Sequence, residues 1–411
     1  MRRMALQIHK FGGTSVGSPE RIQAVARRLA ARRAEGHDLV IVVSAMGDTT
    51  DELLALAAEI SDNPHRREMD MLLSAGERIS MALLSMALNA IGCPAVSFTG
   101  SQSGIITDSG HGRARIVDIK PIRIRQELDK GRVVIVAGFQ GVSPEKEVTT
   151  LGRGGSDTSA VALAIAFRAA ECHIWIDVDG VMTADPRLVP QARHIARLDF
   201  DTMLEFSSRG AGVINVRAVE LGRKFRMPIV ILNSLRDHPG TRVEGHTDME
   251  QTGITGVTAN EQLIAFHLSD LRLDGAGLAE FLGRLIDLGL DLSGLHEYVD
   301  GPGTHGLSFL AADRPENRRG FERVETMAGD AGGRVHRDDD VGAVSVVSNG
   351  VIQAGPLAQR IVACLAGAGV QIRSLSSGTT SITLLVDRGS IPTAVGALHR
   401  ELVEGSVSTP G

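Results

Sequence analysis

The chain has 411 residues, of which 43% are hydrophobic and 22% are charged, and its formal net charge is −6. This mixture is typical of a globular protein with two or more domains and excludes collagen-like, coiled-coil and disordered chains. Aromatic residues make up only 3%, so the chain lacks both the basic surface and the stacking platforms of a nucleic-acid-binding protein. We therefore expect no nucleic-acid partner.

The cysteine and hydropathy patterns predict a location in the reducing cytoplasm. The three cysteines are scattered and form no CxxC pair, which argues against a disulfide framework. No apolar run approaches the roughly 18 residues of a membrane span, and the N-terminus lacks the apolar run of a signal peptide. None of the histidines has zinc-ligand spacing. We expect neither a membrane partner nor a metal site built by the protein alone.

Strands and helices alternate over the first half of the chain. Residues 5–44 predict a strand, a glycine loop, a helix and a buried strand with the sequence LVIVVS. The alternation continues with predicted helices near 68–91, 119–130 and 157–169, and with predicted strands near 95–98, 133–136 and 174–178. Such alternation indicates an α/β sandwich with a mostly parallel sheet, whose ligands bind at the carboxyl ends of the strands.

A polar stretch rich in Gly, Thr and Asp covers residues 236–256 and predicts a connection between domains. Beyond it, a strand–helix–strand–strand–helix pattern occurs at 263–328 and again at 343–402. Two such units in tandem predict paired ferredoxin-like α+β modules. The predicted domains are 1–240, 257–336 and 337–411.

The segment Lys10-Phe11-Gly12-Gly13-Thr14-Ser15 follows a predicted strand and precedes a helix. Glycines at such a turn let backbone N–H groups approach an anion, and Lys10 adds a positive charge. The segment is not a Walker A loop, since GxxxxGK[ST] is absent. A simple structural turn is the alternative.

A second glycine-rich turn, Leu151–Thr158 (LGRGGSDT), opens the helix predicted at 157–169. Arg153 is suited to hold a carboxylate through two parallel hydrogen bonds, and Asp157 to pair with an ammonium group. The alternative is a helix cap with a surface arginine. Two such turns in one α/β sheet favour a binding site.

Two further segments follow predicted strands. The segment 176–187 (IDVDGVMTADPR) brings carboxylates and Arg187 to the end of a strand, where they would suit a nucleotide with Mg²⁺. Acidic turns without a ligand are the alternative. The segment 44–50 (SAMGDTT) supplies hydroxyl groups after another strand.

Taken together, KFGGTSVGSPERI, GRGGSDTSAVALA and DVDGVMTADPR resemble the aspartate kinases of the amino-acid kinase family. The similarity extends through VVSAMGDTTDELL, LLSAGERIS, FTGSQSGI and VAGFQGV. It is strong over residues 1–235, and the C-terminal part resembles the two ACT domains of that family more loosely.

The resemblance implies transfer of the γ-phosphoryl group of ATP, with Mg²⁺, to the β-carboxylate of L-aspartate. It implies catalytic roles for Lys10 and Asp157. It implies that aspartate is held by Ser44, Thr50, Glu77, Arg153, Gly155 and Thr158. It implies that the nucleotide contacts Gly12, Gly13, Asp177, Met182 and Arg187. A homodimer or larger oligomer formed through the ACT modules is also implied.

Three positions depart from the family pattern, and all of them concern the nucleotide. Ile176 replaces a Ser or Thr, Met182 replaces a Tyr, and Gly212 stands where the family has a phosphate-contacting lysine. A preorganised charge of this kind contributes about 3–4 kcal/mol to a transition state. Arg209, three residues earlier, is our candidate to supply the missing charge.

Two alternatives to an aspartate kinase follow from these departures. One is a related enzyme that phosphorylates another amino acid or carboxylate or has an altered nucleotide site. The other is a weakened paralogue that binds aspartate or pairs with an active subunit. Met249 is also a candidate internal start for a separate regulatory subunit.

Overall fold

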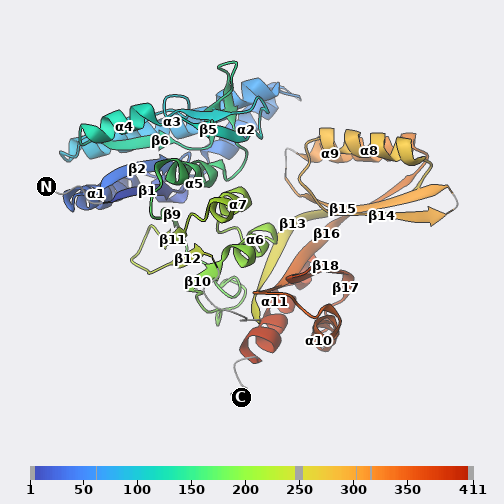
Figure 1. The fold of residues 1–411 in the computed structure, drawn as a ribbon. Coiled ribbons are helices and arrows are strands. Elements are labelled where there is room, and N and C mark those ends of the chain that lie inside the picture. The colour runs from blue at the N-terminus through green and yellow to red at the C-terminus, as the bar shows by residue number, and fades with distance from the viewer. Residues whose placement is uncertain (1–4, 62, 246–252, 302, 315–316, 406–411) are drawn as a thin grey trace. The chain divides into compact units, whose positions relative to one another are not determined.

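The computed structural model describes residues 5–61, 63–245, 253–301, 303–314 and 317–405 (Figure 1). Met249 lies outside the described residues. The described parts of Met1–Met182 and Arg193–Gln251 form one compact unit, and those of Thr183–Ala192 and Thr252–Gly411 form a second.

The first unit is built on an eight-stranded sheet in the order β10-β12-β11-β9-β1-β2-β6-β3. All neighbouring strands run parallel except β11 and β12. The apolar runs of β2 and β6 are buried at its centre, as a strand covered on both faces requires. The strands are β1 Leu6–Phe11, β2 Asp38–Val43, β3 Ala95–Phe98, β6 Val133–Ala137, β9 Cys172–Ile176, β10 Arg197–Asp199, β11 Ile229–Asn233 and β12 Thr241–Glu244.

Helices cover both faces of this sheet, which confirms the predicted sandwich with a mostly parallel sheet. Leu39, Ile41 and Val43 of β2 point into a core shared with α1 and α3. Val42 points the other way, toward Ser156 of α5, because a Cβ added to Gly138 would meet both side chains at 2.8 Å. The helices are α1 Pro19–Ala34, α2 Thr49–Ile60, α3 Arg66–Ala90, α4 Ile122–Asp129, α5 Gly155–Phe167, α6 Phe200–Ser208 and α7 Val216–Phe225.

Several features of the first unit were not predicted from the sequence, including β10, β11, α6 and α7, which follow the last strand predicted before residue 236. Helix α2 follows the hydroxyl-rich segment 44–50. A small sheet in the order β5-β4-β7-β8 stands beside the main one. Strand β12 lies inside the polar stretch 236–256, which was predicted to be only a connection. The small-sheet strands are β4 Ile105–Thr107, β5 Ile116–Ile119, β7 Gln140–Val142 and β8 Val148–Thr150.

Helix α3 has 25 residues and a mean hydropathy of 1.3 over its most apolar window, so among the described helices it alone has the length and composition of a membrane span. Its buried residues include Asp70, Ser74 and Glu77 as well as Leu84 and Leu88. The two leucines belong to the core shared with α1 and β2. These features are those of a core helix of the α/β unit.

The second unit contains one six-stranded sheet in the order β14-β15-β13-β16-β18-β17. Helices α8 and α9 lie side by side over one face of β13–β16 (Figure 1). The strands are β13 Ile254–Leu271, β14 Leu292–Gly301, β15 Thr304–Ala312, β16 Arg334–Ser348, β17 Ile372–Ser377 and β18 Ser381–Asp387. The helices are α8 Gly275–Asp287, α9 Arg318–Asp330, α10 Ala354–Gly367, α11 Ile391–His399 and the π-helix η4 Arg400–Glu404.

The two ferredoxin-like modules share their two central strands. The second half of β13 pairs with β15, and the second half of β16 pairs with β18. Strands β13 and β16 pair with each other from Ile254 to Ser269. Each module therefore takes its fourth strand from the other. The boundary predicted between the modules, at residues 336 and 337, lies inside β16.

Candidate functional site

Lys10 lies at the carboxyl end of β1, between β2 and β9 in the middle of the sheet. Its Nζ is 2.7 Å from Oδ1 of Asp157, and each side chain is only 9% exposed. Burying one of these charges without the other would be costly, so the pair holds both side chains in place. A fixed ammonium group at the carboxyl end of parallel strands is suited to a phosphoryl group.

The loop after β1 packs backbone to backbone against the loop after β2. The N–H of Gly12 donates to the carbonyl of Trp175 at 3.1 Å, and that of Gly47 donates to the carbonyl of Gly13 at 3.1 Å. A Cβ on Gly13 would lie 2.9 Å from the carbonyl oxygen of Ala45, so glycine is required there. The predicted phosphate loop is thus a tight turn beside Lys10.

Helix α5 begins at Gly155, so its positive dipole end lies beside the Lys10–Asp157 pair. A Cβ on Gly155 would lie 2.7 Å from that of Leu151, which explains the glycine. Gly154 precedes the helix in the left-handed conformation at φ 71°. The second glycine-rich turn therefore meets the first one at Lys10.

Glu77, on α3, approaches the same place from a third direction. Its Oε1 accepts a hydrogen bond from the N–H of Ala45 at 3.1 Å, and the residue is 4% exposed. Burial raises the pKa of Glu77 to about 7, although the Ala45 hydrogen bond and the charge of Lys10 oppose the rise. The charge of Glu77 therefore changes near neutral pH.

Asn215, at the start of α7, was missed from the sequence. Its N–H donates to Oδ2 of Asp157 at 3.1 Å, and its Nδ2 donates to the carbonyl of Arg153 at 2.9 Å. Its Oδ1 accepts from Oγ1 of Thr158 at 3.4 Å and caps α7 through the N–H of Arg217. An Asn directly before a helix is the only local signal for this residue.

The other residues implied to hold aspartate lie in the turns after β2 and before α5 and in the first turn of α2. Arg153 is partly exposed, and its Nη2 pairs with Oδ1 of Asp51 on α2 at 2.9 Å. Ser44 follows β2 and is half-buried, and its N–H donates to the carbonyl of Phe11 at 3.1 Å. Thr50 is half-buried in the first turn of α2.

The residues implied to contact nucleotide are less closely grouped. Asp177 follows β9 directly and is exposed. Met182 forms an isolated antiparallel bridge with His194. The next ten residues group with the second unit, and there Arg187 pairs with Asp185 at 2.6 Å. The structure thus keeps Asp177 and Met182 in the first unit and assigns Arg187 to the second.

Gly212 lies in the turn between α6 and α7. It has φ 63°, it is exposed, and a Cβ there would meet only the carbonyl oxygen of Gly210, at 3.8 Å. Arg209 follows α6 as its C-cap residue, and its Nε is 3.2 Å from Oε2 of Glu205. The turn has room for a longer side chain at 212.

Comparison with known proteins identifies the family. A model of the amino acid kinase family matches residues 5–233, and an ACT domain model matches 344–402. The aspartokinase of Mycolicibacterium smegmatis is 43% identical over 406 residues, which cover 96% of both chains. The aspartokinase of Geobacillus stearothermophilus is 42% identical over 399 residues, which cover 96% of this chain and 97% of that one. The chain belongs to the aspartokinase family.

Solved aspartokinases share the fold. The aspartate kinase from Synechocystis is 35% identical with a TM-score of 0.55, and the match covers 96% of this chain and 69% of that one. Aspartokinase III of E. coli, solved with aspartate and ADP, has a TM-score of 0.79 at 22% identity and covers 97% and 100% of the two chains. The resemblance and the fold class predicted from the sequence are confirmed.

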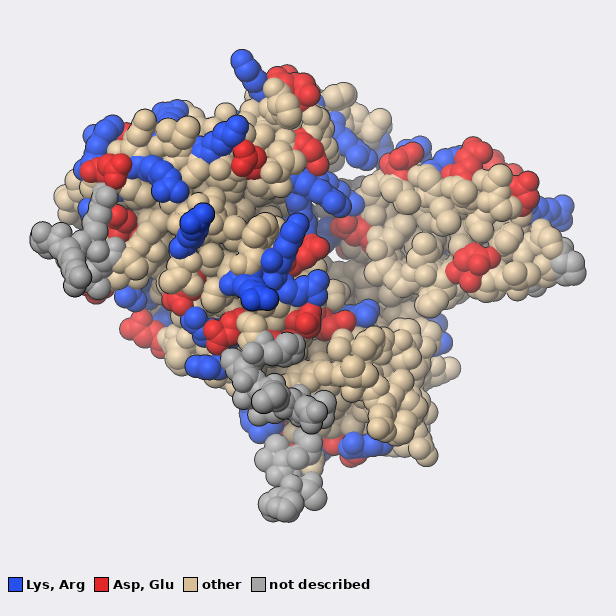
Figure 2. Space-filling model, viewed as in Figure 1, with Lys and Arg blue, Asp and Glu red and all other residues tan. Residues whose placement is uncertain are grey.

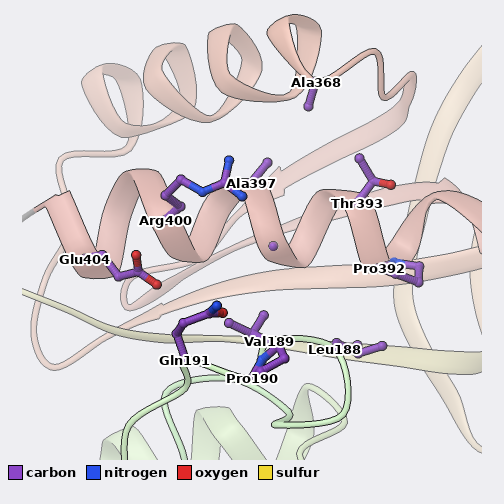
Figure 3. Close-up of a pocket in the computed structure, with 11 residues that line it drawn as sticks. Leu188, Val189, Pro190, Gln191, Ala368, Pro392, Thr393, Ala397, Arg400 and Glu404 are labelled. Carbon is purple, nitrogen blue, oxygen red and sulfur yellow. The ribbon is translucent and has the colours of Figure 1, made fainter.

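The second unit of this aspartokinase-family chain has a cavity of about 560 Å³ (Figure 3). It lies between the segment Leu188–Gln191 and the helical stretch formed by α11 and η4. Arg400 and Glu404 are the charged residues of its lining, which includes none of the side chains that surround Lys10. The cavity is therefore separate from the candidate site.

Basic and acidic side chains are interspersed on the face of the molecule shown in Figure 2. Ion pairs among the charged side chains of the chain include Arg67 with Glu147 at 2.8 Å and Arg242 with Glu171 at 2.6 Å. Surface pairs of this kind contribute about 0–1 kcal/mol each. The Lys10–Asp157 pair differs from these surface pairs because it is buried, so water screens the attraction between its charges less.

Proposed function

We propose that this chain transfers the γ-phosphoryl group of ATP to the β-carboxylate of L-aspartate and forms 4-phospho-L-aspartate. Its relatives named aspartokinase match it over nearly their full length at about 42% identity. The single observation that carries the site assignment is the buried Lys10–Asp157 pair at the meeting point of two glycine-rich turns.

The proposed chemistry depends on positioning and charge neutralisation. The acceptor carboxylate is ionised at neutral pH, so its oxygen attacks the γ-phosphorus without a general base. Lys10 neutralises charge on the transferring phosphoryl group, and Asp157 holds Lys10 in a fixed orientation. The positive dipole end of α5 adds to the charge of Lys10. Such preorganisation is the main means of catalysis in phosphoryl transfer.

The proposed acceptor site lies around this pair. Arg153 would bind a carboxylate of aspartate, and ionised Glu77 would pair with its ammonium group. Ser44, Thr50 and Thr158 would contribute hydroxyl groups, and Gly155 would lie beside them at the start of α5. Asn215 supports the assignment because it ties Arg153, Asp157 and Thr158 together.

The proposed donor site comprises Gly12, Gly13, Asp177 and Met182, with Arg187 as a further candidate. Among the described residues no group of three His, Cys, Asp or Glu side chains could hold a metal ion. The residues of this site fit a Mg²⁺ ion that enters with ATP and keeps its phosphate and water ligands. Asp177 could supply one protein carboxylate. When bound, Mg²⁺ would neutralise the β- and γ-phosphate oxygens.

We also propose a homodimer or larger oligomer formed through the ACT modules. Strands β14 and β17 are the edges of the second sheet, and β14 carries Val299, which is 73% exposed, beside Tyr298. Exposed apolar edge strands pair readily with another chain. Sedimentation of wild type and Val299→Lys would test this, and a monomeric wild type would exclude it. A reducing compartment such as the cytoplasm fits the three free cysteines.

The activity is tested by trapping the acyl phosphate with hydroxylamine. The purified chain is incubated with ATP and Mg²⁺ and with L-aspartate, L-glutamate, N-acetyl-L-aspartate or succinate. Hydroxamate formed with aspartate alone is the expected result. Turnover with another acid only would instead establish the related-enzyme alternative. Aspartate binding without turnover would establish the weakened paralogue.

A further inference from the structure

Asp70 lies on the buried face of α3 and has no exposed surface. Its carboxylate accepts from Nδ1 of His111 at 2.6 Å and from the N–H of Gly112 at 3.1 and 3.2 Å. It also accepts from the hydroxyl of Thr150. Burial of this carboxylate is tolerable because hydrogen-bond donors surround it.

The donors to Asp70 come from two different loops of the first unit. His111 and Gly112 belong to the loop between β4 and β5, and Thr150 ends β8 directly before the turn that carries Arg153. The two loops touch, because a Cβ on Gly152 would lie 3.3 Å from the carbonyl oxygen of Gly112. Asp70 therefore fixes the Arg153 turn directly, through Thr150, and indirectly, through the β4–β5 loop that packs against the turn.

Arg217 joins the same two loops from the other side. Its guanidinium donates to the carbonyl of Leu151 and, at 2.9 Å, to that of Ala114. The turn that carries Arg153 is thus held at Thr150 and at Leu151. Because the hydrogen bonds are made to backbone atoms or to the strand end, they fix the position of the turn that carries Arg153.

The buried face of α3 holds two more loops in the same way. The carbonyl of Ser74 accepts from Nε2 of Gln140 at 3.0 Å, and Glu77 accepts from the N–H of Ala45 at 3.1 Å. Asp70, Ser74 and Glu77 share one helix face because they are spaced four and three residues apart. One rigid helix therefore sets the relative positions of the Ala45 loop, the Gln140 strand and the Arg153 turn.

We propose that Asp70 and His111 are positioning residues for the acceptor carboxylate. They hold the Arg153 turn at the distance from Glu77 and Lys10 that L-aspartate requires, and they do not touch the substrate. The inference rests on the proposed function, since it takes Arg153 to be a substrate ligand. If this is so, loss of the His111–Asp70 contact weakens the binding of aspartate and leaves the binding of ATP unchanged.

Two substitutions of His111 distinguish the effect of losing the hydrogen bond from the effect of losing the imidazole ring. His111→Leu removes the donor, whereas the amide nitrogen of His111→Asn occupies the position of Nδ1 and restores it. We expect His111→Leu to raise KM for aspartate about tenfold and to change KM for ATP by less than about twofold. We expect His111→Asn to return KM for aspartate to within about threefold of the wild type.

His65→Leu is the matched control, because His65 is an exposed histidine at the N-cap of the same helix, where its ring accepts a hydrogen bond from the N–H of Arg67. We expect it to leave both KM values unchanged. The inference is overturned if folded His111→Leu retains the wild-type KM for aspartate. It is also overturned if KM for ATP rises equally, or if His111→Asn behaves like His111→Leu, since a general structural defect has these effects.

A second measurement distinguishes this inference from the proposed function. If the wild type forms no aspartyl hydroxamate, the proposed activity is wrong, and the Kd for aspartate is then measured by calorimetry. Weaker aspartate binding by His111→Leu, restored by His111→Asn, would still support the positioning role. An unchanged Kd, or a wild type that binds no aspartate, would overturn it.

Discussion

Glu77 links the chemistry of the acceptor site to pH. Its carboxylate is buried against the Ala45 loop, and this burial raises its pKa to about 7. Our proposed function requires the ionised form, since it pairs with the ammonium group of aspartate. The fraction of enzyme that is ready to bind aspartate therefore increases as the pH rises through 7.

We accordingly expect KM for aspartate to fall between pH 6 and pH 8 in the wild type, about tenfold at most. In Glu77→Gln, KM should be higher and should not change over this range. Steady-state kinetics at saturating ATP would measure both profiles. A wild-type KM that is constant across the range would show that Glu77 does not titrate there or does not bind the ammonium group.

The raised pKa of Glu77 also makes the stability of the folded chain depend on pH. The pKa of Glu77 is higher in the folded chain than its ordinary value of 4.5. Between pH 4.5 and 7 the unfolded chain therefore loses this proton before the folded chain does, so the wild type loses stability relative to Glu77→Gln as the pH rises. Denaturant unfolding at pH 4.5 and pH 7 would show whether the two proteins differ in this way.

Gly212 is the second residue with a distinct prediction. A lysine there would have room, but it would adopt φ 63°, which costs about 1 kcal/mol for a residue with a side chain. If this position faces the nucleotide as in the family pattern, Gly212→Lys should bind ATP about tenfold more tightly despite that strain. Calorimetry would measure the affinity.

Gly212→Gln is the control, because it introduces the same backbone strain without the charge. It should leave ATP affinity near that of the wild type. Equal ATP binding by wild type, Gly212→Lys and Gly212→Gln would mean that this turn does not contact the nucleotide. In that case the phosphate charge comes entirely from Lys10 and the other groups of the site.

The packing of helix α3 against the Ala45 loop determines the shape of the acceptor site. A Cβ on Gly76 would lie 2.7 Å from that of Ala45. We expect Gly76→Ala to destabilise the chain by about 1–3 kcal/mol through overpacking and to raise KM for aspartate. Denaturant unfolding and steady-state kinetics would measure the two effects.

Gly283→Ala in α8 provides the opposite case. Gly283 is exposed in the middle of a helix, and a Cβ there would meet nothing within 4 Å. We expect this variant to gain up to about 1 kcal/mol from helix propensity and to keep its kinetics. If Gly76→Ala behaved like Gly283→Ala, the close packing of α3 against the Ala45 loop would not control the site.

Most elements were predictable because their signals are local. The apolar runs of β2 and β6 predict central strands, and the two glycine-rich turns predict the anion site. Helix α2 was missed because none of its residues is buried, so it has no buried face to produce a helical pattern. Asn215 and Asp70 were missed because their partners Asp157 and Thr150 lie 58 and 80 residues away along the chain.

At the scale of the whole molecule, the sequence predicted two ACT modules but not their shared strands. The repeated strand and helix pattern is the same whether each module closes on itself or exchanges a strand, so only the strand pairing decides. Because β13 and β16 belong to both modules, we expect the second unit to unfold in one cooperative transition.

Two core substitutions test this cooperativity. Phe266→Ala empties the core under α8 and α9, and Leu384→Ala empties the core under α10 and α11, at a cost of about 2–5 kcal/mol each. Both should lower the midpoint of the same calorimetric transition. Two separate transitions, each shifted by only one substitution, would contradict a shared sheet.

The Lys10–Asp157 pair is the proposed centre of aspartate phosphorylation, and the kcat of Lys10→Gln is the decisive measurement of its role. Glutamine keeps much of the length of the side chain but removes the charge. We expect kcat for aspartyl hydroxamate formation to fall by at least about a hundredfold while aspartate binding measured by calorimetry persists. A Lys10→Gln variant with the kcat of the wild type would contradict this role.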